Sequence, residues 1–155
     1  MDQISFKYEN VYFVSRLIQG QFPNYRQVIP KDFKVEFTGQ RRELLEAFER
    51  SAVIAFSSAN IVKLRIAEDK LYISANTPDL GNSSEWLALK IKGENKAQVA
   101  FNVKLIIDIL KNLTGEEIIF GLNGALNPGM IKPKEEKENY LYIVMPIRTV
   151  ESQGE

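Results

Sequence analysis

The sequence contains no cysteine and no histidine among its 155 residues. Without cysteine there is no disulfide, no thiolate nucleophile, no iron–sulfur cluster and no cysteine zinc site. Without histidine, the most common general base, the Ser-His-Asp triad and every histidine-ligated metal site are excluded. Few hydrolase or oxidoreductase sites tolerate both absences, so we expect a binding protein with no catalytic residues, no cofactor and no metal.

Neither sign of charge dominates, because 20 lysines and arginines balance 20 aspartates and glutamates. Tight nucleic-acid binders are usually basic overall, so we expect contact with a phosphate backbone to be weak or confined to a local patch. The longest apolar run, Leu141–Ile147, is far shorter than the roughly 20 residues of a membrane helix. Charged residues within the first twenty positions argue against a secretory signal. We therefore expect a cytoplasmic protein with no membrane partner.

The length fits one domain, or one domain plus a piece of another. Residues 3–19 alternate apolar and polar side chains on both sides of Glu9-Asn10, which predicts a hairpin with Asn10 in the left-handed region. A lone hairpin is marginal in water, so we expect it to belong to a larger unit. Residues 20–30 resemble a linker in their prolines and glycine, but their apolar content predicts that they are packed down.

The remaining chain predicts two helices packed on antiparallel sheets, an α+β domain. Helical spacing of apolar residues predicts a first helix over 40–55 capped by Thr38, and a second from Val103 capped by Asn102 and stopped near Gly115. Alternation predicts strands over 33–37, 62–66, 71–74, 86–92, 96–101, 117–122, 129–132 and 140–147. Residues 76–83 and 134–139 are predicted to be loops.

Two segments rich in apolar residues and proline stand out, residues 22–30 and 142–148. Proline cannot donate to a strand ladder, so Pro146 is expected at an edge or an end. An edge beside an apolar loop makes a groove for an extended peptide, whereas irregular core packing explains the same residues without a function. Glu135 and Glu136 lie in a lysine-rich turn, where a solvated loop is favoured over a carboxylate pair.

The run from Ser15 to Pro30 resembles the junction between the second and third domains of bacterial β sliding clamps, the processivity subunits of DNA polymerase III. The resemblance continues through 42–47, 73–78, 101–103 and 142–148, and covers residues 3–149 in order. It implies a C-terminal fragment of a clamp. Residues 1–30 would be the last hairpin of domain two and the crossing, residues 31–149 domain three, and residues 150–155 a flexible tail.

The resemblance also implies a function in DNA replication. Two protomers of the family close into a homodimeric ring that encircles duplex DNA without sequence preference and slides along it. Polymerase, clamp loader and repair proteins dock through short peptides carrying a glutamine and large apolar residues. The positions matching the peptide groove and its margin are Pro23, Gln27, Val28, Asn102, Leu105, Leu126, Pro128, Ile143, Val144, Met145, Pro146, Ile147 and Arg148. Gln27 stands where many relatives carry a basic residue.

The positions matching the ring-dimer seam of the family are Val53, Ile54 and Glu85. Val53 and Ile54 are equally well explained as ordinary core residues. Arg42, Lys104 and Lys111 are the candidates for facing DNA, with plain surface charges as the alternative. Two rival functions remain: a non-catalytic, β-rich homo-oligomeric module unrelated to replication, and a hydrolase that uses Glu135 or Glu136.

Overall fold

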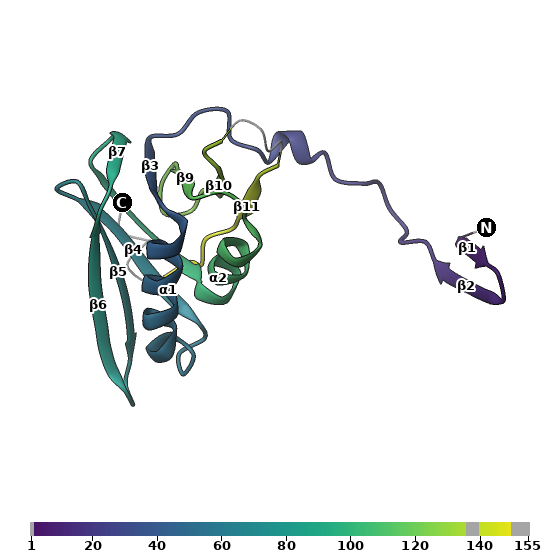
Figure 1. The fold of residues 1–155 in the computed structure, drawn as a ribbon, viewed down its shortest axis with the longest axis horizontal. Helices are drawn as coiled ribbons and strands as arrows, with labels where there is room; N and C mark the ends of the chain where they lie inside the picture. Colours follow the sequence, from purple (N-terminus) through teal and green to yellow (C-terminus); the bar gives the residue numbers. More distant parts are fainter. Residues whose placement is uncertain (1, 136–139, 150–155) are drawn as a thin grey trace.

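Alternating apolar and polar residues build three antiparallel sheets in the computed structural model, which describes residues 2–135 and 140–149 (Figure 1). The strands are β1 Gln3–Tyr8, β2 Val11–Arg16, β3 Val35–Gln40, β4 Ile61–Ala67, β5 Lys70–Thr77, β6 Gly81–Ala88, β7 Lys90–Gly93, β8 Lys96–Asn102, β9 Glu117–Leu122, β10 Gly129–Pro133 and β11 Tyr142–Val144. The helices are the 3-10 helix η1 Tyr25–Gln27, α1 Arg41–Ala55 and α2 Val103–Asn112.

The N-terminal hairpin stands apart from the other two sheets at the end of an extended segment (Figure 1). Its two-residue turn joins Tyr8 to Val11, and the left-handed residue is Glu9 (φ 50°), not Asn10 as predicted. The first central position of a tight hairpin turn needs a positive φ, so position decides here rather than residue type. The apolar linker is also not packed down as expected, since Phe22 is 81% exposed.

Two sheets form the folded body, with strand orders β11-β10-β9-β3-β7 and β6-β5-β4-β8. The predicted loop over 76–83 is wrong, because β5 and β6 pair as far as Thr77 and Gly81. The Thr77 hydroxyl accepts a hydrogen bond from the Leu80 N–H at 3.0 Å, which closes a much shorter turn. The predicted strand over 86–92 is in fact two strands that break at Leu89, since β6 pairs with β5 and β7 pairs with β3.

The first helix begins directly after β3, so the predicted cap Thr38 is instead a strand residue. The Arg41 N–H donates to the Glu116 carbonyl at 2.7 Å, and the Gln40 side chain makes no capping bond. The prediction for the second helix is confirmed, because the Asn102 side chain accepts from the Lys104 N–H at 3.0 Å. That helix ends at Asn112, before Gly115. Within the described residues no helix is long and apolar enough to cross a membrane.

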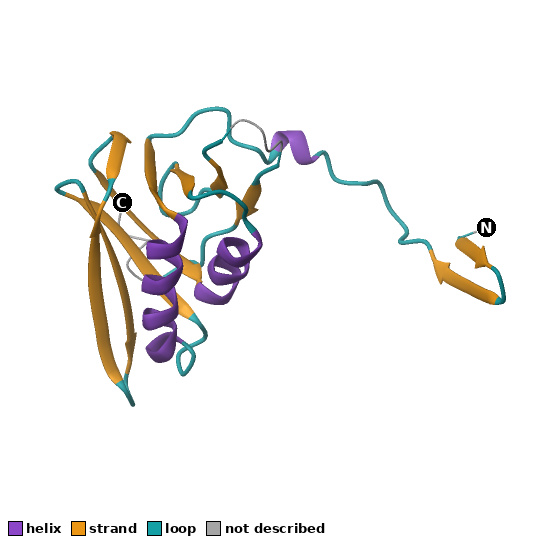
Figure 2. Ribbon diagram, in the orientation of Figure 1, coloured by secondary structure: helices purple, strands orange, loops and turns teal. Residues whose placement is uncertain are grey.

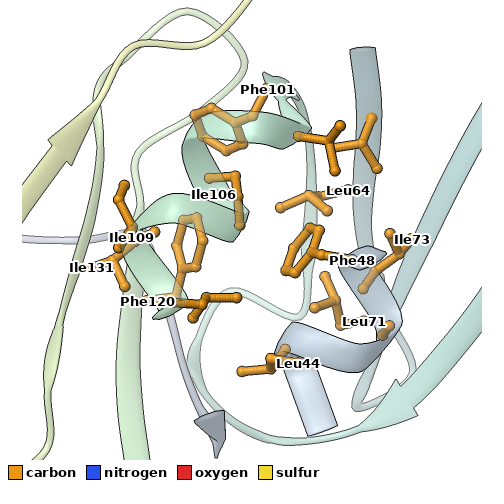
Figure 3. Packing of buried hydrophobic residues seen from close by; sticks show 14 of the residues in the cluster. Leu44, Phe48, Leu64, Leu71, Ile73, Phe101, Ile106, Ile109, Phe120 and Ile131 are labelled. Carbon is orange, nitrogen blue, oxygen red and sulfur yellow. The ribbon is translucent and has the colours of Figure 1, made fainter. Parts of the chain in front are cut away.

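The core lies between the helices and the sheets, and four buried phenylalanines run through it: Phe37, Phe48, Phe101 and Phe120. Phe37 and Phe120 stack with ring centroids 5.0 Å apart, and Phe101 lies 5.9 Å from Phe120. Figure 3 shows Phe48 of α1 pointing toward the β4 and β5 residues Leu64, Leu71 and Ile73. Both helices gather on one side of the body (Figure 2), which confirms the α+β prediction.

Candidate partner-binding surface

The C-terminal segment of the described chain connects the two sheets of the body. Strand β11 is an edge strand whose Val144 pairs with Gly129 of β10. The chain then leaves that sheet, and the Ile147 N–H donates to the Ala100 carbonyl of β8 at 2.8 Å. Pro146 therefore lies just beyond a strand end, as its missing N–H requires, and the predicted strand over 140–147 is reduced to three residues.

At Gly129 the backbone of β10 comes close to neighbouring side chains, and the lack of a side chain there lets the C-terminal segment pack. A Cβ there would lie 3.0 Å from the Phe101 ring, 3.2 Å from Phe120 and 3.4 Å from Val144. Val144 is buried by this packing, whereas the next residue, Met145, is 59% exposed. Gly129 is not among the predicted site residues, although the Pro128-Gly129 dipeptide marks a backbone position where a side chain is often excluded.

The start of α2 forms the margin of the same surface. Asn102 ends β8 and caps the helix, and the Val103 N–H donates to the Asn60 carbonyl at 2.8 Å. Leu105, in the first turn, is exposed, while Ile106 beside it is buried in the core. Because Ala100 holds Ile147 and Phe101 packs near Val144, the helix start and the C-terminal segment are brought together.

The predicted groove residues therefore fall into two groups. The structure brings together the C-terminal wall, which we define as residues 126–128 and 143–148 with Asn102 and Leu105 at its margin. It leaves Pro23, Gln27 and Val28 exposed on and around η1 rather than burying them against that wall. The hydrogen bonds of η1 are local, from the Tyr25 N–H to Pro23 and from the Val28 N–H to Tyr25.

The predicted seam residues lie at the end of α1 and on β6, an edge strand of the four-stranded sheet. Val53 is 67% exposed, so it is not a core residue, whereas Ile54 is half-buried against the core. Glu85 accepts two hydrogen bonds from the Arg50 guanidinium, at 2.7 and 3.1 Å. This contact ties α1 to β6, and the hydrogen bond raises the pKa of Arg50.

The three candidate DNA-facing cations lie on the helices, and each already has a neighbour. Arg42 pairs with Glu46 at 2.8 Å, a hydrogen bond that raises the pKa of Arg42. Lys111 of α2 pairs with Glu49 of α1 at 2.8 Å, and Lys104 lies over the exposed ring of Phe56, 5.3 Å from its centroid. Exposed ion pairs are worth about 0.2–1 kcal/mol, so a phosphate can replace the acidic partner at little cost.

Within residues 2–135 and 140–149, the acidic side chains form no site that would favour a hydrolase. Glu135 is exposed, and Glu136 lies outside the described residues, as does the predicted tail over 150–155. Among the residues that the structure describes, no group of three or more acidic side chains could hold a metal ion.

Comparison with known proteins places this fold in a class. A family model described as DNA polymerase III beta subunit, C-terminal domain, matches residues 26–148. The solved DNA polymerase III beta subunit from Thermotoga maritima superposes with a TM-score of 0.83 and 35% identity, over 96% of this chain and 40% of that one. The Bacillus subtilis sliding clamp gives 0.80 and 34%, with the same coverage. The fold is that of a sliding-clamp domain.

The chain belongs to the family formed by the C-terminal domains of DNA polymerase III beta subunits. The curated beta sliding clamp of Bacillus subtilis (strain 168) is 35% identical over 150 residues, which are 95% of this chain and 39% of that protein. The chain thus spans about two fifths of the length of that relative. Membership of this family does not favour the unrelated homo-oligomeric module.

Proposed function

We propose that the chain forms the C-terminal domain of a ring-shaped processivity clamp that acts in the cytoplasm. The intact ring would encircle duplex DNA and tether the replicative polymerase. The observation that carries this proposal is the family match over residues 26–148, on a fold shared with solved clamps. Tethering raises the local concentration of polymerase at its substrate, and this effect needs no catalytic group.

Within this proposal the partner site is a groove between η1 and the C-terminal wall. Val28, Leu126 and Met145 are exposed apolar side chains on irregular segments, where neither a helix nor a full strand ladder covers them. Pro128 and Pro146 withhold backbone donors beside them. An apolar groove on irregular segments suits an extended peptide with apolar anchors. A few polar contacts at the rim of the groove would hold the peptide.

The occupant we propose is a short peptide segment of a polymerase, clamp loader or repair protein, with a glutamine and large apolar residues. Met145 is flexible enough to accept side chains of different shape. Each buried Leu or Phe anchor would contribute about 1.5–3 kcal/mol before the cost of association. Two anchors therefore contribute about 3–6 kcal/mol, which is comparable to the cost of association. We expect weak peptide binding by this chain, whose η1 side chains are not packed against the C-terminal wall.

A paired substitution tests the groove. Met145 and Leu80 are similarly exposed, at 59% and 57%, but Leu80 lies in the turn between β5 and β6. Titration of the isotope-labelled chain with such a peptide should shift the amide signals of Val28, Leu126 and Met145. Met145→Glu should abolish the shifts, and Leu80→Glu should leave them unchanged. Shifts elsewhere, or equal loss in both variants, would refute the assignment.

The helix layer is the surface we propose to face duplex DNA. Arg42, Lys104 and Lys111 supply cations there, and Glu46 and Glu49 lie beside two of them. This mixed charge gives weak, sequence-blind contact, which is what sliding requires. Replacing Lys104 and Lys111 by glutamine should flatten the salt dependence of residual duplex binding, and an unchanged slope would remove these residues from the proposal.

The edge formed by β6 and the end of α1 is the surface we propose for the ring seam. Val53 offers an exposed apolar contact, and β6 has a free side for strand pairing. The Arg50–Glu85 pair connects the two elements. In the assembled ring, Val53→Asp should shift the equilibrium from closed dimer toward monomer in sedimentation experiments. An unchanged equilibrium would contradict the seam.

A further inference from the structure

The four-stranded sheet carries a concentrated positive charge on the face that points away from the helices. Alternation along β4, β5, β6 and β8 buries one set of side chains under α1 and α2 and turns the other set outward. The outward strand positions include Lys63, Arg65, Lys70 and Lys96, and no aspartate or glutamate. Acidic residues occur only at its ends, in the turns around residues 68–69, 79 and 94.

Two aromatic rings lie side by side among these cations. Tyr72 of β5 pairs with Arg65 of β4 on one side and with Trp86 of β6 on the other, so the three side chains form a row across the sheet. The Arg65 guanidinium carbon lies 4.0 Å from the Tyr72 ring centroid, and the Lys70 ammonium 4.5 Å from that of Trp86. Trp86 is nevertheless 56% exposed.

A polar hollow adjoins this row two residues further along the strands. It has a volume of about 540 Å³ and is lined by Lys63, Ser74, Asn76, Asn82 and Ser84, among others. Hydroxyl and amide groups of this kind can both donate and accept hydrogen bonds. The sheet face therefore combines flat rings, cations and short polar side chains, and lacks an apolar trough.

We propose that this outward sheet face binds single-stranded nucleic acid. Exposed rings on an antiparallel sheet are the usual platform for unstacked bases, and nearby cations neutralise the phosphates. The Arg65 plane over Tyr72 is itself a stacking surface. Exposed cation–π contacts are weak, so a base can replace Lys70 over the Trp86 ring. The displaced Lys70 ammonium can then pair with a phosphate. An acidic protein segment would use the cations but would leave the rings without a role.

This site is separate from the DNA contact in the proposed function, because the helices and the outward face lie on opposite sides of the sheet (Figure 1). Loss of one contact therefore leaves the other measurable. Peptide binding at the C-terminal wall is a third, independent readout.

The experiment uses Trp86 as its own reporter, since it is the sole tryptophan of the chain. An oligothymidine of about 12 nucleotides, within the usual range for such platforms, should quench its fluorescence saturably, and an abasic strand of equal length should not. By fluorescence anisotropy with the labelled strand, Trp86→Ala should weaken binding about tenfold. Arg65→Gln should reduce the slope of log affinity against log salt by about 0.7. Arg16→Gln, an exposed arginine on β2 of the separate N-terminal hairpin, is the matched control and should change neither quantity.

Trp86→Phe keeps a ring for stacking and should bind within a few fold of the wild type, which guards against misfolding of the alanine variant. Several results would overturn the proposal. These are equal quenching by the abasic strand, equal binding of duplex, loss of binding in Arg16→Gln but not in Arg65→Gln, or binding of polyglutamate in preference to oligothymidine. The last result would assign the face to an acidic protein partner.

Discussion

Gly93 and Gly81 offer a matched test of how strand β7 is held against its neighbour β3 in the five-stranded sheet. Both residues have a left-handed backbone, with φ values of +93° and +87°. A Cβ at residue 81 would meet nothing within 4 Å, whereas one at residue 93 would overlap the carbonyl oxygen of Lys34. That oxygen accepts the Glu94 N–H at 2.8 Å, beside the pairing of Gly93 with Val35. Replacement of each glycine by alanine therefore differs in one respect: only the Cβ at residue 93 clashes with a neighbour.

The magnitudes follow from these contacts. Gly81→Ala should cost only the strain of the left-handed backbone, about 1–2 kcal/mol in the free energy of unfolding. Gly93→Ala should add the loss of the Glu94–Lys34 hydrogen bond, about 1 kcal/mol, and the displacement of strand β7. We expect a total of about 3 kcal/mol, a large share of the roughly 5–15 kcal/mol that stabilises a domain.

Urea unfolding followed by circular dichroism measures both variants against the wild type. The slope of free energy against urea should stay unchanged, so that a shifted midpoint reports stability alone. The melting temperature of Gly93→Ala should fall by roughly 6–12 °C. Equal losses in the two variants would refute the reasoning, because they would mean that β7 and β3 do not meet at Lys34.

Three further substitutions test the core, a helix cap and an ion pair. Phe48→Ala should cost about 3–5 kcal/mol in urea unfolding, and a loss below about 1 kcal/mol would contradict its place in the core. Asn102→Ala should cost about 1 kcal/mol, whereas Asn82→Ala, on the exposed face of β6, should stay within about 0.5 kcal/mol; equal losses would argue against the cap. The hydrogen bond from Lys134 at 2.6 Å lowers the pKa of Glu117. The stabilisation from this ion pair is present above the ordinary glutamate pKa and is lost as the pH falls below about 4. Lys134→Gln should therefore lose less stability than the wild type between neutral pH and about pH 3. An equal loss of stability in the two proteins would contradict this.

The fold class could be predicted because the sequence signals are local. Helical spacing around Phe48 and the Asn102 cap give both helices, and strict alternation gives the strands that surround them. The errors occur where long-range pairing outweighs local composition. Residues 76–83 are polar and contain Pro78 and Gly81, yet the ladder between β5 and β6 extends through them. The continuous pattern over 86–92 gives no sign that the chain changes sheets at Leu89.

The partner surface was predicted largely by resemblance, and only its prolines carried a physical signal. Pro146 marks the end of an edge strand, which backbone chemistry requires. The bond from Ile147 to Ala100 joins residues nearly fifty positions apart, so no local pattern could reveal it. The same holds for Gly129, whose role depends on three side chains from the strands β8, β9 and β11. The outward row of Arg65, Tyr72 and Trp86 was missed because the strands were interpreted only for their buried faces.

The passage of the chain from β6 to β7 has a mechanical consequence. Because Leu89 links strands of different sheets, and its N–H donates to Asp69 at 3.2 Å, tension on the β6 edge passes through covalent bonds to β7 and its partner β3. For one sheet to slide past the other, the hydrogen bond from Leu89 to Asp69 at this connection would have to break. A domain built in this way transmits load as a stiff link. If such domains assemble into the ring proposed above, we expect the seams between protomers to open before any domain deforms.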